Sequence, residues 1–439
     1  MVFYGTLFLF FQGENIANNI LLIPECKYSL IALAPAIFFA SINSVFRGYF
    51  NGIQKISQTA KSQTIEQIFK SILTILFVEI ISIYCSNTIL MAGIANFAST
   101  CSIFISFIYM FISYRNLRKI ERIEEFRYNI HRKESTVKIL KKIFAVSIPI
   151  TLSAILGTLS KNIDSFTVVR ILTPILGENA AKLRYGILSS KVDILTVMPL
   201  SFNIAFATAL VPAISLAKEN NDINSINKKL SFSLLITAII AFPSAIGLSL
   251  YSSQIFNLLF PNANGGAELL RISAFCIIFM GLTQTIGGAL QGIGKLNVSA
   301  IALLIGIIAK FFSNVILIPI SNIYEKGAII GNLVSGIVTF TIVWNVLKNS
   351  IDLNFKLSKI ILKPIFASGI MAIVSYSLYI FLISSGIENM ISIILVIISA
   401  ILIYGFMIFY IKTFSKEEIL LLPNGEKIYD FLKKLKIYN

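Results

Sequence analysis

Charged side chains are scarce in this sequence: Asp, Glu, Lys and Arg make up only 13% of its 439 residues, where a soluble domain has about 25%. This scarcity excludes an ordinary soluble protein. Histidine occurs once, as His131 in a basic loop, and the four cysteines lack the spacing of a metal site. A single loop histidine supports no Ser/His/Asp or Cys/His constellation, and no Walker loop follows a strand. The sequence therefore predicts a protein that is not an enzyme and that carries no metal and no cofactor.

Long apolar runs take the place of charge. The mean hydropathy is +0.83, and a helix needs about 20 apolar residues to cross the hydrocarbon core of a membrane. An outer-membrane barrel would show alternating strands of ~10 residues, and the sequence has no such pattern. We therefore predict an all-α polytopic membrane protein with eleven spanning segments. Their cores are 31–50, 64–83, 89–113, 143–172, 186–216, 230–259, 271–291, 298–319, 327–347, 361–384 and 390–411.

The basic residues are distributed unevenly among the loops. The net charge is +16, a value that on its own would also suit a nucleic-acid binder. When the loop 114–142 is placed in the cytoplasm, most of the 37 Lys and Arg fall on that side of the membrane. This is the positive-inside pattern, which predicts a multi-pass protein of the cell membrane with its C-terminus in the cytoplasm. The charge then indicates contact with anionic membrane lipids and no nucleic-acid partner.

One phrase occurs twice, 240 residues apart. "FNGIQKI" runs from Phe50 to Ile56, and "LQGIGKL" runs from Leu290 to Leu296. Both copies leave a helix on the cytoplasmic side, so the repeat is parallel. In transporters, a parallel repeat gives two like-oriented helical bundles with substrate bound between them. The same offset pairs Lys55 with Lys295 within the phrase, and Ala60 with Ala300 and Lys70 with Lys310 beyond it.

The first bundle is shorter than the second. Residues 143–348 supply six helices, whereas residues 1–113 supply three and a remnant at Val2–Phe11 that is too short to span a membrane. We therefore predict that the first bundle is incomplete. By the repeat, about 100 residues are missing before Met1, and the chain is expected to be N-terminally truncated.

A basic linker, 114–142, joins the two bundles. Its Arg115–Lys142 stretch carries ten basic and four acidic residues among apolar ones, which predicts an amphipathic helix lying on anionic lipid. Two extra spanning helices at 361–411 and a basic cytoplasmic tail at 412–439 follow the second bundle.

The stretch "RGYFNGIQKISQTAKSQTIEQI", Arg47–Ile68, resembles a known family. It is similar to the polysaccharide-transporter branch of the multidrug/oligosaccharidyl-lipid/polysaccharide (MOP) flippase superfamily, and within it to stage V sporulation protein B-like proteins and lipid II flippases. Gln58 stands where the family has proline. Ser147–Asp164 and Met198–Ser215 resemble the family's seventh and eighth helices. The matching residues of the first motif are Arg47, Gly48, Tyr49, Phe50, Asn51, Gly52, Thr59, Ala60, Ser62, Gln63, Glu66 and Gln67.

The resemblance implies a function that hydropathy alone does not. Members of the family move undecaprenyl-linked sugar intermediates between the leaflets of the bacterial cytoplasmic membrane, so the expected partner is a lipid-linked sugar pyrophosphate. Such a head group requires a polar, preferably cationic cavity that faces each side in turn. Any driving force is expected to come from an ion gradient or the membrane potential. Two alternatives stay open: a cation-coupled multidrug antiporter of the same superfamily, and an inactive fragment or scaffold.

Ionisable residues inside spanning segments are the candidate functional residues, because burial makes them expensive. Lys191 and Asp193 precede Pro199 and Pro212, and two prolines in one segment favour kinks beside a cavity. The resemblance implies that cations on this helix face the cavity, so Lys191→Ala is expected to abolish rescue of a flippase-depleted strain. The alternative is that Lys191 reaches the outer interface with Asp193 beside it.

Lys161 and Asp164 lie three residues apart on one predicted helix. This spacing allows them to form a structural pair with each other; the alternative is that they line the cavity. Asn162 adds hydrogen-bonding capacity without charge.

The cytoplasmic half of the repeat holds the remaining candidates. Glu66 precedes Lys70 by four residues, which predicts an ion pair, whereas Gly306 leaves Lys310 without that local neutralisation. Lys70 and Lys310 either face the cavity from both bundles or extend to the interface. Arg47, beside the repeated turn, either contacts pyrophosphate at the inner mouth or anchors the helix end.

Overall fold

The structure is a computed structural model of the chain. It describes residues 2–21, 23–53, 55–85, 87–125, 135–261, 265–354, 357–420, 425–434 and 438. His131 lies outside these residues. Within them, eleven helices are long and apolar enough to cross a membrane, which confirms the predicted all-α polytopic fold.

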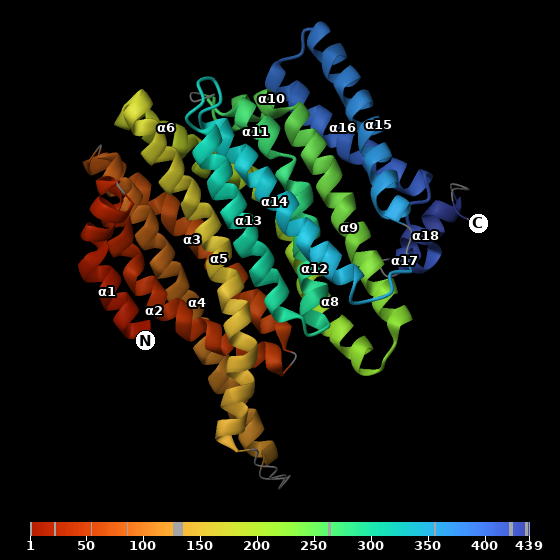
Figure 1. The fold of residues 1–439 in the computed structure, drawn as a ribbon, viewed down its shortest axis with the longest axis horizontal. Coiled ribbons are helices and arrows are strands. Elements are labelled where there is room, and N and C mark those ends of the chain that lie inside the picture. The colour runs from red at the N-terminus through yellow and green to blue at the C-terminus, as the bar shows by residue number, and fades with distance from the viewer. Residues whose placement is uncertain are drawn as a thin grey trace. The chain divides into compact units, whose positions relative to one another are not determined.

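The chain divides into two compact units, Met1–Glu134 and Ser135–Asn439. The boundary falls inside the stretch 114–142. The first unit is a small helical layer in which α2 and α3 both pack against α4, and α1 packs against α2 (Figure 1, red to orange). Its helices are α1 (Val2–Asn15), a π-helical turn (Ile16–Ile20), a 3₁₀ turn (Pro24–Cys26), α2 (Lys27–Gly52), α3 (Ile56–Tyr84) and α4 (Thr88–Glu125).

The second unit is a larger bundle (Figure 1, yellow to blue). In it α13 packs against α5 and α14, α12 packs against α8, α9 and α14, and α15 packs against α9 and α16. Its helices are α5 (Thr136–Leu176), α6 (Glu178–Ile187), a π-helical turn (Leu188–Val192), α7 (Asp193–Val197), α8 (Leu200–Glu219), α9 (Ile223–Leu250), α10 (Ser252–Leu259), α11 (Ala267–Ser273), α12 (Cys276–Gly292), α13 (Leu296–Leu317), α14 (Glu325–Lys348), α15 (Leu357–Ser384), α16 (Asn389–Tyr410), α17 (Lys416–Leu420) and α18 (Gly425–Lys434).

Apolar contacts between helices that are distant in sequence hold the second unit together. Leu230 of α9, Ile286 of α12 and Val343 of α14 belong to one buried cluster. The C-terminal tail folds back onto the same unit, where Ile419 and Tyr429 join a cluster formed largely by α9, α15 and α16. The tail is therefore anchored by burial as well as carrying basic charge.

Three predicted spans are broken in the structure. The predicted span 186–216 consists of α6, the π-helical turn, α7 and α8, with the main break at Pro199, because proline cannot donate a backbone hydrogen bond. α8 continues unbroken through Pro212, so only the first of the two prolines interrupts the helix. The segment 230–259 breaks at Tyr251, and 271–291 breaks between α11 and α12.

The linker differs from the prediction. Residues 114–125 continue α4, and α5 begins at Thr136, so the described parts of 114–142 extend the two spanning helices. Residues 126–134 lie outside the described residues. A separate amphipathic helix is therefore not found in the part of the linker that the structure describes.

The repeated phrase forms the same turn in both units. Lys55 N–H donates to the Phe50 carbonyl at 2.9 Å, and Lys295 N–H donates to the Leu290 carbonyl at 2.8 Å. In the second copy Gly294 has φ +83°, the left-handed conformation that closes a helix in a Schellman motif. In the first copy Gly48 and Gly52 both lie within α2. The repeated phrase therefore reflects a helix-end turn that the two units share.

Gly288 sets the close approach of α12 to α8. A Cβ atom at this position would lie 2.6 Å from the Ala207 carbonyl oxygen, so Gly288→Ala must push the two helices apart. We expect the free energy of unfolding to fall by about 1–3 kcal/mol, measured by thermal unfolding in detergent. Gly247→Ala, where a Cβ meets no atom within 4 Å, is the control. Equal stability of the two variants would contradict the close packing.

Candidate functional site

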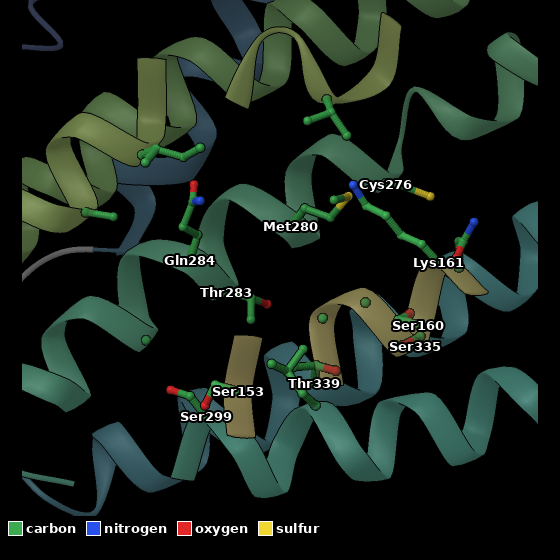
Figure 2. A pocket seen from close by; sticks show the side chains of 18 of the residues that line it. Ser153, Ser160, Lys161, Cys276, Met280, Thr283, Gln284, Ser299, Ser335 and Thr339 are labelled. Carbon is green, nitrogen blue, oxygen red and sulfur yellow. The ribbon is translucent and has the colours of Figure 1, made fainter. Parts of the chain in front are cut away.

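A cavity of about 460 Å³ lies within the second unit. Its walls come from α5, α7, α8, α12, α13 and α14, with Ser273 at the end of α11 (Figure 2). Most of the wall is apolar, as in ligand pockets that use a few placed polar groups for recognition. Charged side chains lie toward one end of the wall, whereas neutral polar side chains occur along its length.

A buried ion pair forms one part of the cavity wall. Lys310 Nζ donates to Asp164 Oδ2 at 2.7 Å, and the two side chains are only 1% and 5% exposed. Lys310 also donates to the Ser160 carbonyl. Asn314 donates to Asp164 Oδ1 at 3.1 Å, and Asn332 donates to Oδ2 at 3.4 Å.

This cluster satisfies the requirement that buried charges be paired and hydrogen-bonded. Asp164 comes from α5, Lys310 and Asn314 come from successive turns of α13, and Asn332 comes from α14. The arrangement ties three helices together. It leaves Lys310 neutralised within the protein.

Lys161 and Asp193 contribute two further charges to the same cavity. Figure 2 shows Lys161 extending from α5 into the cavity on the side of Cys276 and Met280. Among the described residues, neither Lys161 nor Asp193 forms a hydrogen bond or an ion pair through its side chain. An ammonium that points into a cavity without a partner can meet an anion as a point charge.

Of the two alternatives for Lys161 and Asp164, the ion pair between them is not formed, and both residues line the cavity. Asp164 pairs with Lys310, which lies 146 residues away in sequence, and Lys161 points into the cavity instead. Gly306 indeed provides no local partner for Lys310, but α5 supplies one through tertiary packing. Asn162 lies apart from this cluster, in a shallow hollow of α5 with Thr158 and Leu159.

Lys191 lies away from the cavity. Its Nζ sits 4.7 Å from the centroid of the Phe260 ring, and the residue is not part of the cavity wall. Asp193, two residues later, does line the cavity. The π-helical turn that contains Lys191 ends immediately before Asp193, so the two side chains leave the backbone in different directions.

In the first unit, Arg47 pairs with Glu66 at 2.6 Å and also donates to Ser62 at 3.0 Å and Ser106 at 3.2 Å. The predicted Glu66–Lys70 pair is therefore wrong, because the carboxylate turns toward α2. Lys70 is exposed. The repeat-related Lys70 and Lys310 thus have different surroundings.

Sequence reasoning missed the uncharged members of the site. Asn314 follows Lys310 by one helical turn, and this spacing could have placed both on one face. No spacing or motif in the sequence indicated that Asn332 would join this cluster. A second polar network was missed as well: Asn203 donates to Gln284 Oε1 at 2.9 Å, and Thr237 donates to Asn203 Oδ1 at 2.7 Å.

Comparison with known families identifies the class of protein. A model of the family described as polysaccharide biosynthesis protein matches residues 1–218, and a model of the MatE family matches residues 149–316. The chain belongs to the MOP superfamily, as its motifs predicted.

Two relatives from Bacillus subtilis (strain 168) illustrate the relationship. The chain is 24% identical over 346 residues to stage V sporulation protein B, covering 77% of this chain and 64% of that protein. It is 25% identical over 348 residues to lipid II flippase MurJ, covering 77% of this chain and 63% of that protein. The matches thus span less than two thirds of the length of either relative.

Solved structures share the fold. Lipid II flippase MurJ in an inward closed conformation has a TM-score of 0.64 and 18% identity, covering 93% of this chain and 81% of that one. An inward-facing MATE family multidrug resistance transporter has a TM-score of 0.57 and 15% identity, covering 79% of each chain. The MOP fold predicted from the sequence is confirmed.

Proposed function

We propose that this chain is a flippase that moves a lipid-linked sugar phosphate between membrane leaflets by alternating access. The observation that carries the proposal is Lys161, whose ammonium enters a cavity in the membrane-spanning bundle while the neighbouring Lys310 is already neutralised by Asp164. The named activity of the relative MurJ, lipid II flippase, supports the same class of substrate.

Physical chemistry connects that arrangement to the function. A phosphate and a sugar head do not enter hydrocarbon unaided, since each unpaired polar group costs several kcal/mol there. A cavity with one uncommitted cation lowers that barrier for a single anionic group. The chain is proposed to lie in the bacterial cytoplasmic membrane with its C-terminus inside, as the distribution of Lys and Arg predicts.

A second candidate is cation-coupled antiport of an organic compound. Asp193 favours it, because an unpaired carboxylate in the cavity can hold a proton or a metal cation. The match of the MatE family to residues 149–316 covers most of the cavity wall.

Reconstitution of the purified chain in liposomes separates the two candidates. For a flippase, fluorescent undecaprenyl-pyrophosphoryl sugar placed in both leaflets should become fully accessible to an external quencher, at least about tenfold faster than in empty liposomes. An antiporter should instead release trapped ethidium when a sodium or proton gradient is applied. Lipid movement at the rate of empty liposomes would overturn the flippase proposal.

A further inference from the structure

The cavity has two chemically different ends. Its four charged side chains gather at one end: Lys161, Asp164, Asp193 and Lys310. Ser153 precedes Lys161 by eight residues on α5, which is about 12 Å along the helix axis at 1.5 Å per residue. Ser299 precedes Lys310 by eleven residues on α13, which is about 16 Å by the same rise. The end away from the charges therefore lies near the beginning of α13 and beside the middle of α5.

Neutral hydrogen-bonding groups line that second end. α12 contributes Thr283, Gln284 and Gln291 to it, and α13 contributes Ser299. Figure 2 shows Gln284, Thr283, Ser153 and Ser299 on one side of the cavity and Lys161 with Cys276 on the other. Among the residues that the structure describes, the side chains that line this end are uncharged.

Two of these groups have unmet hydrogen-bonding capacity. Within the part of the chain that the structure describes, the hydroxyl oxygens of Thr283 and Ser299 are buried and have no hydrogen-bond partner. A buried polar group in a native protein nearly always has a partner, so two unpaired hydroxyls on one cavity wall require an explanation. Gln284 uses its carbonyl oxygen to accept from Asn203, which leaves its amide hydrogens available to a ligand.

Gly287 keeps the space beside these hydroxyls open. It lies one turn after Thr283 on the same face of α12, and a Cβ atom there would approach Ser299 Oγ to 3.3 Å. Any larger side chain would crowd the Ser299 hydroxyl. The wall thus combines small residues with hydroxyl and amide groups.

We propose that this end of the cavity is a subsite for the sugar of the lipid-linked substrate, and this proposal rests on the proposed flippase function. A phosphate or carboxylate would find no cation at this end to compensate its charge, and an apolar group would leave both hydroxyls unpaired. A neutral group rich in hydroxyls satisfies them, because serine and threonine hydroxyls both donate and accept. The phosphate of the same molecule then lies toward Lys161.

Binding of two matched lipids to the purified full chain tests the subsite. The probes are undecaprenyl pyrophosphate and the same lipid carrying a neutral disaccharide, with Kd measured in detergent by microscale thermophoresis. We expect the disaccharide-bearing lipid to bind about tenfold more tightly, as two or three hydrogen bonds would give. In the double variant Thr283→Val/Ser299→Ala, that preference should fall to about twofold or less.

The variants are chosen to preserve the fold. Neither substitution breaks a hydrogen bond formed within the described residues, so the unfolding temperature should not fall. Thr341→Val removes an exposed hydroxyl outside the cavity and should leave the preference unchanged.

Each outcome decides between the proposals. Equal binding of both lipids by the wild type, or a preference that survives in the double variant, would overturn the subsite and leave the flippase proposal standing. Failure of both lipids to bind would overturn the flippase proposal and the subsite with it. Loss of the preference in the double variant alone would support both.

Discussion

Lys310→Met is expected to lower the free energy of unfolding of the second unit by about 3–5 kcal/mol, because it leaves the Asp164 carboxylate buried without its cation. The two Asn amides that remain cannot replace a full charge. Thermal or denaturant unfolding of the purified chain in detergent measures the loss.

A double-mutant cycle separates loss of the pair from loss of packing. Asp164→Asn should also be destabilising, since it strands the Lys310 ammonium, whereas the double variant Asp164→Asn/Lys310→Met buries no charge and should recover much of the loss. Lys326→Met, which breaks a pair with the exposed Glu268, should change stability by less than about 1 kcal/mol. Additive losses in the double variant would refute a direct Asp164–Lys310 interaction.

This pair also shows where sequence reasoning stops. Lys161 and Asp164 have the spacing of a helical ion pair. Nothing in the sequence near Asp164 indicates that Lys310, which is far away in sequence, is its partner instead of Lys161. The packing of α13 against α5 decides the choice. The same holds in the first unit, where Glu66 bonds Arg47 of α2 instead of Lys70 one turn along its own helix.

Features governed by local chemistry were predictable. Apolar runs of sufficient length predicted eleven spanning helices, and the described residues contain eleven. The repeated phrase predicted a shared helix-end turn, and both copies form the same backbone hydrogen bond. Both the spanning helices and the helix-end turn depend on residues that are close together in the sequence.

The cavity wall was harder to predict, because α12 carries polar residues on more than one face. Thr283 and Thr285 differ by two positions, yet Thr283 lines the cavity and Thr285 lies within 2.7 Å of the Thr237 hydroxyl in a buried network. Two residues along a helix point to nearly opposite sides. Without knowing which helices flank α12, the two threonines cannot be assigned to cavity or core.

Lys161→Glu is expected to abolish transport of the lipid-linked sugar in liposomes, with a loss of at least about tenfold. A charge-assisted hydrogen bond contributes about 1.5–3 kcal/mol, and tenfold corresponds to about 1.4 kcal/mol. Reversing the charge adds repulsion of the phosphate. Lys161→Arg should retain most of the activity, because it keeps a cation at the same place on α5.

Lys191→Glu is the matched comparison, since the same substitution is made on a second lysine of the same unit. The family resemblance implied Lys191 as the transport cation, with the outer interface as the alternative; in the structure its ammonium lies against the Phe260 ring and outside the cavity wall. Transport should therefore depend on Lys161 and change little with Lys191. The reverse result would restore Lys191 as the phosphate-binding residue and place the substrate path outside this cavity. The sugar subsite on α12 would then lie apart from the lysine that binds the phosphate of the same substrate.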